Sequence, residues 1–328
     1  MVASPPRVEE HQWFAIVNPV AGNGSGLDDF PRISKLLRDH RIHCEAVFSE
    51  HKFHAVELTV EAVRRGYRRI IAVGGDGTLH EVVNGLFIQQ VVPPSEVLLA
   101  VIAVGSGNDW VRMFGIPHNY GEAIRAIGEE HSFLQDVGVV SYEEAKYRQS
   151  RYMANVAGAG YDAQVVRRFT HLKKKGRSGR WLYRWSVIRS FFRYKPTGVK
   201  VWVDGRRVYN DLLLSIALGV GKYNGGGIQQ LPDAVADDGM FDISLVRPIH
   251  FWHIIFRFHK LFNGKIYEIR HILRERGGTI RIESTPEIEV EVDGELLGHT
   301  PLEFTMLRQA IRVVVSRDFL ALKESSAG

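Results

Sequence analysis

Cysteine is almost absent from this sequence, which contains Cys44 and no other cysteine in 328 residues. A single cysteine excludes intrachain disulfides and the cysteine clusters of zinc-finger sites. Chains without disulfides are typical of reducing compartments, so we expect a cytoplasmic protein.

Long apolar segments are absent as well. Residues 1–11 are polar and contain proline, whereas a secretory signal peptide is basic and then apolar. The longest apolar run, residues 212–220, is much shorter than the roughly 20 residues that span a bilayer. We therefore expect a soluble protein that could meet a membrane only at its surface.

Acidic residues are missing from residues 163–203, which we call the basic block. This block carries 12 Lys or Arg and no Asp or Glu, whereas the rest of the chain carries 30 basic and 37 acidic residues. The net charge of +5 therefore comes from one region. A local basic block favours an anionic partner, although a solvated basic helix or loop would have the same composition.

The first third of the chain alternates between strand and helix patterns. Apolar runs predict strands at 13–17, 41–48, 70–73 and 98–104, and helical periodicity predicts helices at 27–40, 55–65 and 78–87. Repeated β-loop-α units imply a mainly parallel sheet with helices on its faces. We therefore predict an α/β domain over residues 1–135, to which residues 318–328 could return.

The pattern changes near Asp136. Short alternating segments predict antiparallel strands with one wet face, for example at 199–203, 241–245, 280–282 and 288–292. Asp204-Gly205 and Asp293-Gly294 have the composition of hairpin turns. Helical patterns at 181–194 and 251–262 interrupt the strands. We predict a mostly β second domain over residues 136–317.

Three glycine-rich turns follow predicted strands of the first domain, at 18–26, 74–78 and 105–109. In an open α/β sheet, loops at the carboxyl ends of parallel strands line one crevice. Glycine lets backbone N–H groups approach a phosphate, and a following helix adds its positive N-terminal end. Neither a Walker A sequence nor a G-x-G-x-x-G pattern after the first strand is present. Phosphate charge must therefore be met by backbone amides, a metal or side chains from elsewhere.

Residues 73–85, Val-Gly-Gly-Asp-Gly-Thr-Leu-His-Glu-Val-Val-Asn-Gly, resemble the signature of the diacylglycerol kinase catalytic-domain family, which includes sphingosine and ceramide kinases and bacterial lipid kinases. Further matches follow in the family's order between residue 14 and about residue 315: Asn18-Pro19 with Gly22, Gly105-Ser106-Gly107-Asn108-Asp109, Gly225-Gly226-Gly227, Pro232-Asp233-Ala234, Asp237-Asp238-Gly239 and Asp293-Gly294-Glu295. This coverage is much more specific than any one motif.

The resemblance implies two domains with ATP in the cleft between them. The first would be similar to NAD kinase and phosphofructokinase, and the second would be an antiparallel β-sandwich that binds the lipid substrate. The positions that match the family's nucleotide-binding residues are Asn18, Pro19, Val20, Ala21, Gly22, Ser49, Gly74, Gly75, Asp76, Gly77, Thr78, Leu79, His80 and Ser106. Asp76 would face the phosphates and their Mg²⁺, which prefers oxygen ligands.

Two further sites are implied by the resemblance. Glu295 matches the family's proton-accepting glutamate, although Asp293-Gly294-Glu295 would otherwise be read as an ordinary hairpin turn. Asp238 matches a structural Mg²⁺ site that the backbone carbonyls of Val235 and Met240 would complete, and its alternative is a solvated loop. His80 stands where relatives often have asparagine, and it could act as a base or simply pack at the helix start.

These features favour an ATP-dependent lipid kinase that uses ATP and Mg²⁺ and converts diacylglycerol to phosphatidic acid. A sphingoid-base or other long-chain lipid kinase is a close alternative. An NAD kinase-like enzyme and a non-catalytic nucleotide- or lipid-binding regulator are more distant ones. We expect no nucleic-acid partner, because no known DNA-binding motif accompanies the basic block. The sequence is compatible with an oligomer.

Access to a membrane lipid requires docking, and residues 167–195 of the basic block are the candidate surface. Trp181, Trp185, Ile188 and Phe192 share one helical face, and Tyr183, Val187 and Tyr194 form a second apolar side. Aromatic and basic residues together are typical of helices that lie in the membrane interface, but the same spacing occurs in core packing. We expect a cytoplasmic protein that associates peripherally with membranes.

Neutralising Lys173, Lys174 and Lys175 together is expected to weaken binding to anionic vesicles. Each basic residue near such a surface contributes on the order of 1 kcal/mol. Vesicle co-sedimentation measures the change, with neutral vesicles as the control. Unchanged binding to anionic vesicles would contradict the docking role.

Overall fold

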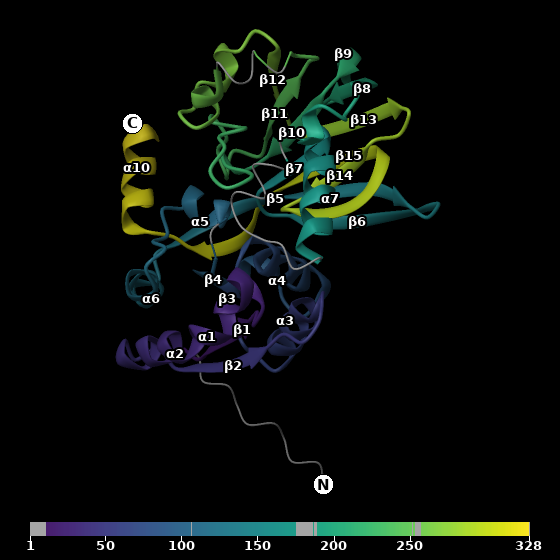
Figure 1. The fold of residues 1–328 in the computed structure, drawn as a ribbon. Helices are drawn as coiled ribbons and strands as arrows, with labels where there is room; N and C mark the ends of the chain where they lie inside the picture. The colour runs from purple at the N-terminus through teal and green to yellow at the C-terminus, as the bar shows by residue number, and fades with distance from the viewer. Residues whose placement is uncertain are drawn as a thin grey trace. The chain divides into compact units, whose positions relative to one another are not determined.

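The computed structural model describes residues 11–105, 107–174, 186, 189–250, 252 and 257–327 (Figure 1). The chain forms two compact units. Unit 1 contains Met1–Gln135 and Gln309–Gly328, and unit 2 contains Asp136–Arg308. The chain returns to unit 1 at Gln309 rather than at 318, because the end of the last strand belongs to the sheet of unit 1.

The sheet of unit 1 is parallel throughout its described pairs. It contains β1 (Trp13–Val17), β2 (Cys44–Phe48), β3 (Arg69–Gly74), β4 (Leu98–Ala103) and the end of β15 (Glu295–Val314). Their order is β15-β4-β3-β1-β2. The parallel arrangement confirms the prediction from the β-loop-α pattern, and it brings the carboxyl ends of β1, β3 and β4 to one edge.

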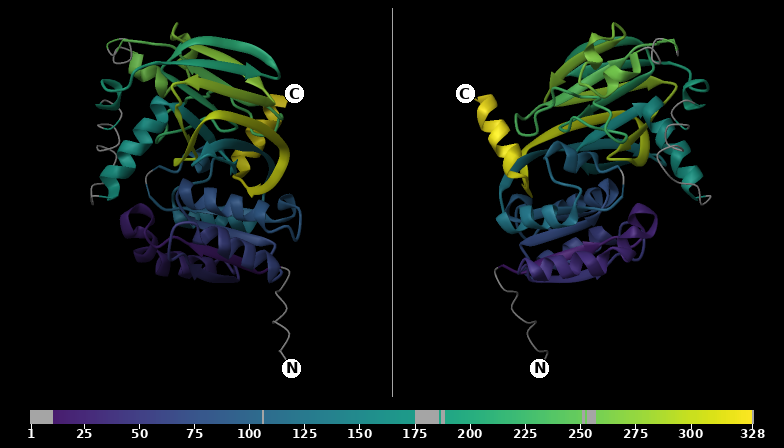
Figure 2. Two further views of the ribbon diagram at one scale, coloured as in Figure 1. Left: turned by 90° about the vertical axis from the view of Figure 1, so that its right-hand side faces the viewer. Right: turned by 60° about the vertical axis from the view of Figure 1, so that its left-hand side comes forward.

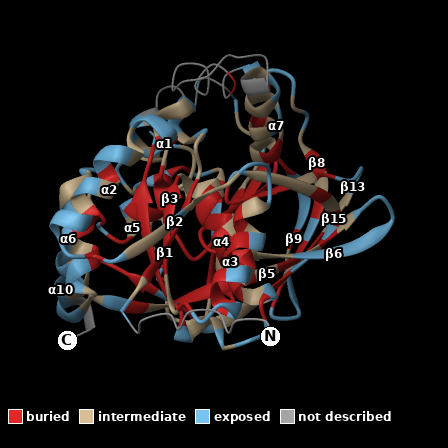
Figure 3. Cartoon of the chain, turned by 90° about the horizontal axis from the view of Figure 1, so that it is seen from below, coloured by how far each residue is buried: buried red, intermediate tan, exposed pale blue. Residues whose placement is uncertain are grey.

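Helices cover both faces of this sheet (Figures 2 and 3). On one face, α2 (Phe30–Asp39) and α6 (Tyr120–Glu129) pack Ile33, Leu37, Ile124 and Ile127 against alternate residues of β1, β3 and β4. The other face carries α3 (His54–Arg64) and α4 (Asp76–Ile88). Shorter elements are η1 (Ala21–Gly24), α1 (Ser25–Asp28), η2 (Pro94–Glu96) and α5 (Asp109–Met113), and α10 (Arg317–Ala327) follows β15.

Unit 2 is built from antiparallel strands. They are β5 (Ser132–Glu144), β6 (Tyr147–Met153), β7 (Val156–Gly160), β8 (Thr197–Val203), β9 (Arg206–Leu213), β10 (Ser215–Gly219), β11 (Phe241–Val246), β12 (Ile272–Gly277), β13 (Thr279–Thr285), β14 (Glu289–Val292) and the start of β15. One path runs β12-β11-β10-β7-β14-β15, and β13, β8 and β9 extend from β15. The helix α7 (Tyr161–Lys174) follows β7, and η3 (Phe258–Leu261) and η4 (Ile266–Glu268) precede β12.

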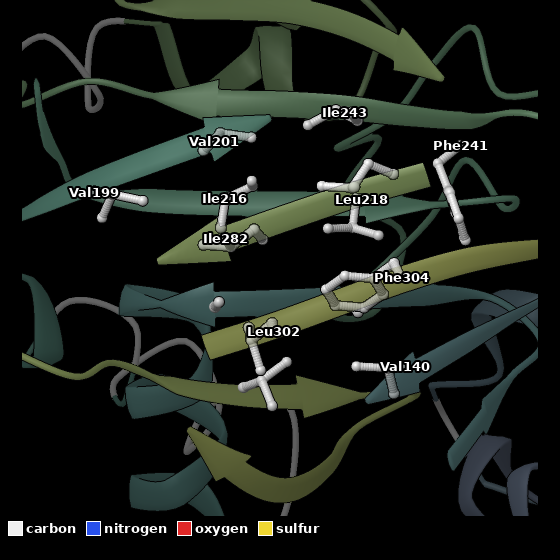
Figure 4. Close-up of a cluster of buried hydrophobic side chains, with 14 of the residues drawn as sticks. Val140, Val199, Val201, Ile216, Leu218, Phe241, Ile243, Ile282, Leu302 and Phe304 are labelled. Atoms are coloured by element: carbon white, nitrogen blue, oxygen red, sulfur yellow. The ribbon is translucent and has the colours of Figure 1, made fainter. Parts of the chain in front are cut away.

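The core of unit 2 is formed by buried hydrophobic side chains that its strands contribute (Figure 4). Alternate residues of each strand point inward, as the period of two requires. Val201 and Val203 on β8 therefore lie beside their register partners Ile282 and Ile280 on β13, and all four side chains belong to the core. Phe241 and Phe304 meet edge-on, with ring centroids 6.2 Å apart. This alternation is the pattern that the sequence shows in the same segments.

Both Asp-Gly hairpin turns are confirmed by the backbone. Asp204 and Gly205 have φ of 48° and 78°, and Asp293 and Gly294 have φ of 50° and 85°. Positive φ at both central residues matches the right-handed twist of the strands that the turn joins. The predicted helices at 181–194 and 251–262 lie largely outside the described residues. Within the described ranges, every helix falls short of the length or apolar character that a bilayer crossing requires.

Phe304→Ala is expected to lower the free energy of unfolding by about 3–5 kcal/mol, because the side chain is only 1% exposed and its loss leaves a cavity. Urea unfolding measures the change. Tyr147→Ala, at a position 71% exposed, is the control and should cost less than about 0.5 kcal/mol. Equal effects of the two substitutions would contradict the proposed core.

Candidate functional site

The first and second glycine turns of unit 1 are joined by a side-chain hydrogen bond. The Asn18 amide nitrogen donates to Thr78 Oγ1 at 3.0 Å, and the backbone N–H of Asn18 donates to the carbonyl of Val73. A Cβ on Gly74 would lie 2.3 Å from Thr78 Oγ1, so only glycine leaves room for this threonine at the end of β3. The carboxyl ends of β1 and β3 are thereby locked to each other.

The first and third turns approach each other through two glycines. Gly22 has φ of +60° and Gly105 has φ of +108°, both in the region that favours glycine. A Cβ on Gly22 would lie 3.2 Å from the Cα of Gly105. Side chains at these positions would push the turns apart.

The second and third turns are joined by Asp76. Its Oδ2 accepts from the backbone N–H of Asp109 at 3.1 Å, and its Oδ1 accepts from that of Trp110 at 3.3 Å. These N–H groups begin α5 and have no partner within the helix. The three glycine turns therefore contact one another in pairs, as their place after parallel strands predicts.

The turn at 74–78 opens the helix α4 without a capping side chain. Gly75 is the N-cap, and a glycine has no side chain that could cap the helix. The first N–H groups of a helix and its dipole favour an anion at such an end. With 13 residues, α4 is long enough for this effect. The backbone of Gly75 to Gly77 is therefore suited to receive a phosphate.

Other predicted nucleotide residues lie in different settings. Pro19 and Ala21 are partly exposed on the first turn, and Val20 is exposed. Ser49 follows β2, and its N–H donates to the carbonyl of Val17. Ser106 lies outside the described residues.

Leu79 and His80 are 2% and 1% exposed. His80 Nε2 lies 3.4 Å from the Asn84 amide nitrogen, one helical turn further along α4. Both side chains are buried in unit 1, so a nucleotide at this turn would meet the backbone of Leu79 and His80. Their role in nucleotide binding stays a prediction, and the buried side chain of His80 fits the packing alternative.

Glu81 has a role that the sequence pattern did not reveal. Its carboxylate accepts from the backbone N–H groups of Phe53 at 3.0 Å and Ala55 at 3.2 Å. It thereby caps the N-terminus of α3 and holds the loop that follows Ser49. The sequence does show an acidic residue near the start of α4. It gives no sign of the capping role, because the N–H groups that Glu81 binds lie far away in the sequence.

In unit 2, the Asp293-Gly294-Glu295 turn is fixed by Asp293. Its carboxylate accepts from the backbone N–H groups of Ala154, Asn155 and Val156 at 2.9–3.2 Å. Glu295 follows as the first residue of β15 and is partly buried. Three backbone donors on one carboxylate make this turn a rigid support for Glu295.

Asp238 is already engaged by protein groups. Its Oδ2 accepts from the Arg276 guanidinium, and its Oδ1 accepts from the Met240 N–H at 3.0 Å. Arg276 also donates to Asp242, whose pKa is raised because the carboxylate is fully buried. A cation coordinated by Asp238, Val235 and Met240 would have to compete with Arg276. The residues as placed fit a salt-bridged loop better than a metal site.

A second possible metal group fits poorly. Ligand atoms of His51, His54 and Glu57 lie within 4.8 Å of one another. The Glu50 N–H donates to His54 Nδ1 at 2.9 Å, so the neutral ring of His54 carries its proton on Nε2. That proton occupies the position through which the ring would bind a metal. We assign no metal to this group.

Unit 1 thus has the architecture of a phosphate-binding α/β domain, and unit 2 adds a β domain with a fixed carboxylate turn. Comparison with known proteins agrees with both. Residues 12–140 match the diacylglycerol kinase catalytic domain, and residues 155–315 match the YegS C-terminal NAD kinase beta sandwich-like domain. The chain therefore belongs to the diacylglycerol kinase catalytic domain family, and this confirms the resemblance seen in its motifs.

Similar proteins share most of this chain's length. A diacylglycerol kinase of Staphylococcus haemolyticus is 27% identical over 92% of this chain and 88% of its own. A diacylglycerol kinase of Staphylococcus aureus is 28% identical over 93% and 92%. A crystal structure of a diacylglycerol kinase from Bacillus anthracis has a TM-score of 0.71 at 25% identity, covering 95% and 99%. Yeast NADH kinase, with a TM-score of 0.51 at 11% identity, shares the fold alone.

Arg276→Met is expected to lower the free energy of unfolding by roughly 3 kcal/mol, because it removes a donor from the buried Asp242. Urea unfolding with and without a chelator measures this. The control is Arg148→Met, which breaks an exposed pair with Glu303 and should cost at most about 1 kcal/mol.

A chelator is expected to leave the stability of the unliganded wild type unchanged. A clear loss of stability on chelation would contradict the salt-bridged loop and support a metal at Asp238.

Proposed function

We propose that this protein is an ATP-dependent lipid kinase that transfers the γ-phosphoryl group to diacylglycerol and forms phosphatidic acid. The observation that carries the proposal is the pairwise contact of the three glycine turns around the uncapped start of α4. Membership of a kinase family makes ATP the phosphate donor. The related proteins named diacylglycerol kinase support the acceptor.

The phosphate groups of ATP would be held mainly by backbone. Gly22, Gly75 and Gly77 leave N–H groups unshielded by side chains, and the start of α4 favours negative charge. These backbone donors would bind the phosphate charge in place of a Walker A lysine, which the sequence lacks. Phosphoryl transfer asks the protein mostly to position and stabilise charge, which fixed backbone donors do well.

Asp76 would organise this site and orient the metal that accompanies ATP. The two backbone donors of α5 fix the Asp76 carboxylate at the start of α4. Carboxylate oxygen is a ligand that suits a hydrated Mg²⁺, which keeps several waters. When bound, Mg²⁺ would neutralise charge on the transferred phosphoryl group.

Glu295 would accept the proton of the lipid hydroxyl. In a loose transition state this proton leaves late, so the base mainly needs a fixed position. The hold of Asp293 on three backbone N–H groups supplies that fixity. A base in motion would spend much of its time outside hydrogen-bond reach of the hydroxyl.

The identity of the lipid is the finer part of the proposal. A sphingoid-base acceptor would use the same phosphate turns and the same base. The fold likeness to yeast NADH kinase is the observation that keeps a nucleotide acceptor as a second candidate. Against it, the matched family model covers residues 12–140 as a lipid kinase domain.

Peripheral membrane contact through residues 167–195 is part of the same proposal. Phe192 is 67% exposed and stands beside Arg193, which suits an interface between water and lipid. Tyr194 instead packs inward, since its hydroxyl would lie 2.7 Å from a Cβ on Gly160. The other aromatic residues of the predicted helical face lie outside the described residues.

Glu295→Gln is expected to lower kcat for diacylglycerol by about 10²–10⁴-fold while leaving the KM for ATP close to that of the wild type. The amide keeps the shape but cannot accept the proton. Formation of labelled phosphatidic acid from labelled ATP measures the effect. Glu303→Gln, an exposed glutamate on the same strand, is the control and should retain full activity. Full activity of Glu295→Gln would refute the assigned base.

A further inference from the structure

Two carboxylates lie together inside unit 2, close to the turn that carries Glu295. Glu291 on β14 is 1% exposed, and Asp162 lies in the first turn of α7. Gly158 on β7 is the register partner of Glu291. A Cβ on Gly158 would lie 2.8 Å from Glu291 Oε1 and 3.2 Å from Asp162 Oδ2. Both carboxylates therefore occupy the space that a side chain at Gly158 would fill.

Amide side chains connect the two carboxylates. The Asn224 amide nitrogen donates to Glu291 Oε1 at 3.2 Å and to Gln230 Oε1 at 3.1 Å. The Gln230 amide nitrogen donates to Asp162 Oδ2 at 3.2 Å. This network brings a donor to each carboxylate but no positive charge, because asparagine and glutamine are neutral.

Glu291 also contacts the Asp293-Gly294-Glu295 turn. Its Oε2 accepts from the backbone N–H of Gly294 at 2.9 Å. The pairing of β14 with β15 shifts register between Glu289 and Glu291, and such a bulge re-aims the side chains beside it. The side chain of Glu291 therefore points toward the hairpin turn between β14 and β15. There it binds Gly294, the residue that precedes Glu295.

Two ionised carboxylates beside the same glycine would repel each other, and the repulsion is screened little by water because Glu291 is buried. Burial and the nearby Asp162 raise the pKa of Glu291 to about 8, and burial raises the pKa of Asp162 to about 6. At neutral pH the pair therefore retains about one proton. This proton relieves the repulsion while Glu291 keeps its bond to Gly294.

We propose that Glu291 is a positioning residue for the Asp293-Gly294-Glu295 turn, and that the pair it forms with Asp162 must hold a proton for the turn to keep its position. The inference rests on the proposed role of Glu295. Loss of the proton would place two negative charges beside the turn and push Glu291 away from Asp162. Glu295 would then lose its fixed place, and transfer would slow without a change in ATP binding.

Among the residues that the structure describes, the other charged groups around the pair do not compensate its negative charge. On α7, Arg167 forms an ion pair with Glu289. The carboxylate of Asp293 faces Glu291 from the turn and is held by three backbone donors. Tyr194 lies against Asp162 and is neutral at physiological pH, because burial raises its pKa. On β15, Glu295 carries no positive charge and His299 pairs with Glu287, while β7 has no ionisable residue.

The test compares wild type with Glu291→Gln, which mimics the protonated carboxyl, and with Glu291→Ala, which removes it. The control is Glu287→Gln, at an exposed glutamate just before β14. We expect kcat of the wild type to fall as pH rises through about 8, with the KM for ATP unchanged. Glu291→Gln should keep kcat within about twofold of wild type at pH 7 and should lack this alkaline fall. Glu291→Ala should lose kcat at every pH and show faster amide exchange around Gly294.

A second measurement does not depend on kinase activity. The pKa of Glu291 is raised by folding, so its stabilising effect is complete below about pH 4.5 and is lost as pH rises to about 8. Over this range the unfolding equilibrium constant of wild type should rise relative to that of Glu291→Gln, by up to about tenfold per pH unit.

Parallel pH profiles of wild type and Glu291→Gln in both measurements would overturn the proposal. An alkaline fall of kcat shared by both proteins, or full kcat in Glu291→Ala, would overturn the positioning role. If no lipid is phosphorylated by wild type, the proposed function fails, and the stability comparison still decides whether the pair holds a proton.

Discussion

The two hydrogen bonds from the carboxylate of Asp76 to the start of α5 are the contact on which the site of unit 1 depends. Glycine turns have high conformational entropy, so they keep one shape only where contacts fix them. Asn18 ties the first turn to the second, Gly22 meets Gly105, and Asp76 completes the set. Removing its acceptor oxygens would take away a hydrogen-bond acceptor from two backbone N–H groups at α5, which costs about 1–3 kcal/mol.

Unit 2 uses carboxylates in the same way. Asp293 binds three backbone N–H groups, Asp136 binds that of Gly239, and Asp204 binds those of Gly278 and Thr279. Charge-assisted bonds to backbone are strong and directional, so each fixes the turn in which it lies. The acidic residues of the motifs therefore act largely as supports. Glu295 is the one for which we propose chemistry on the substrate.

Much of this fold could be predicted from the sequence because its signals are local. Strand β1 spans residues 13–17 as predicted, and α3 and α4 differ from their predicted ranges by one or two residues. The contact of the three glycine turns could also be predicted. Each turn follows a parallel strand, and parallel strands end at one edge of the sheet. Two Asp-Gly turns were recognisable because their backbone demands positive φ.

The site residues that the sequence did not reveal depend on long-range contacts. Glu81 caps a helix that begins 27 residues earlier, at His54, and Arg276 reaches back to Asp238. His80 follows a phosphate turn in the sequence, but the pitch of α4 directs it into the core. Glu291 reads as one polar residue in an alternating strand, and only the pairing with Gly158 shows that it is buried beside Asp162.

The central claim is that this chain phosphorylates a lipid. The most direct measurement is incubation of the purified protein with labelled ATP, Mg²⁺ and a mixed lipid extract, followed by identification of the labelled product. We predict label in phosphatidic acid. Label in NAD with none in any lipid would contradict the claim.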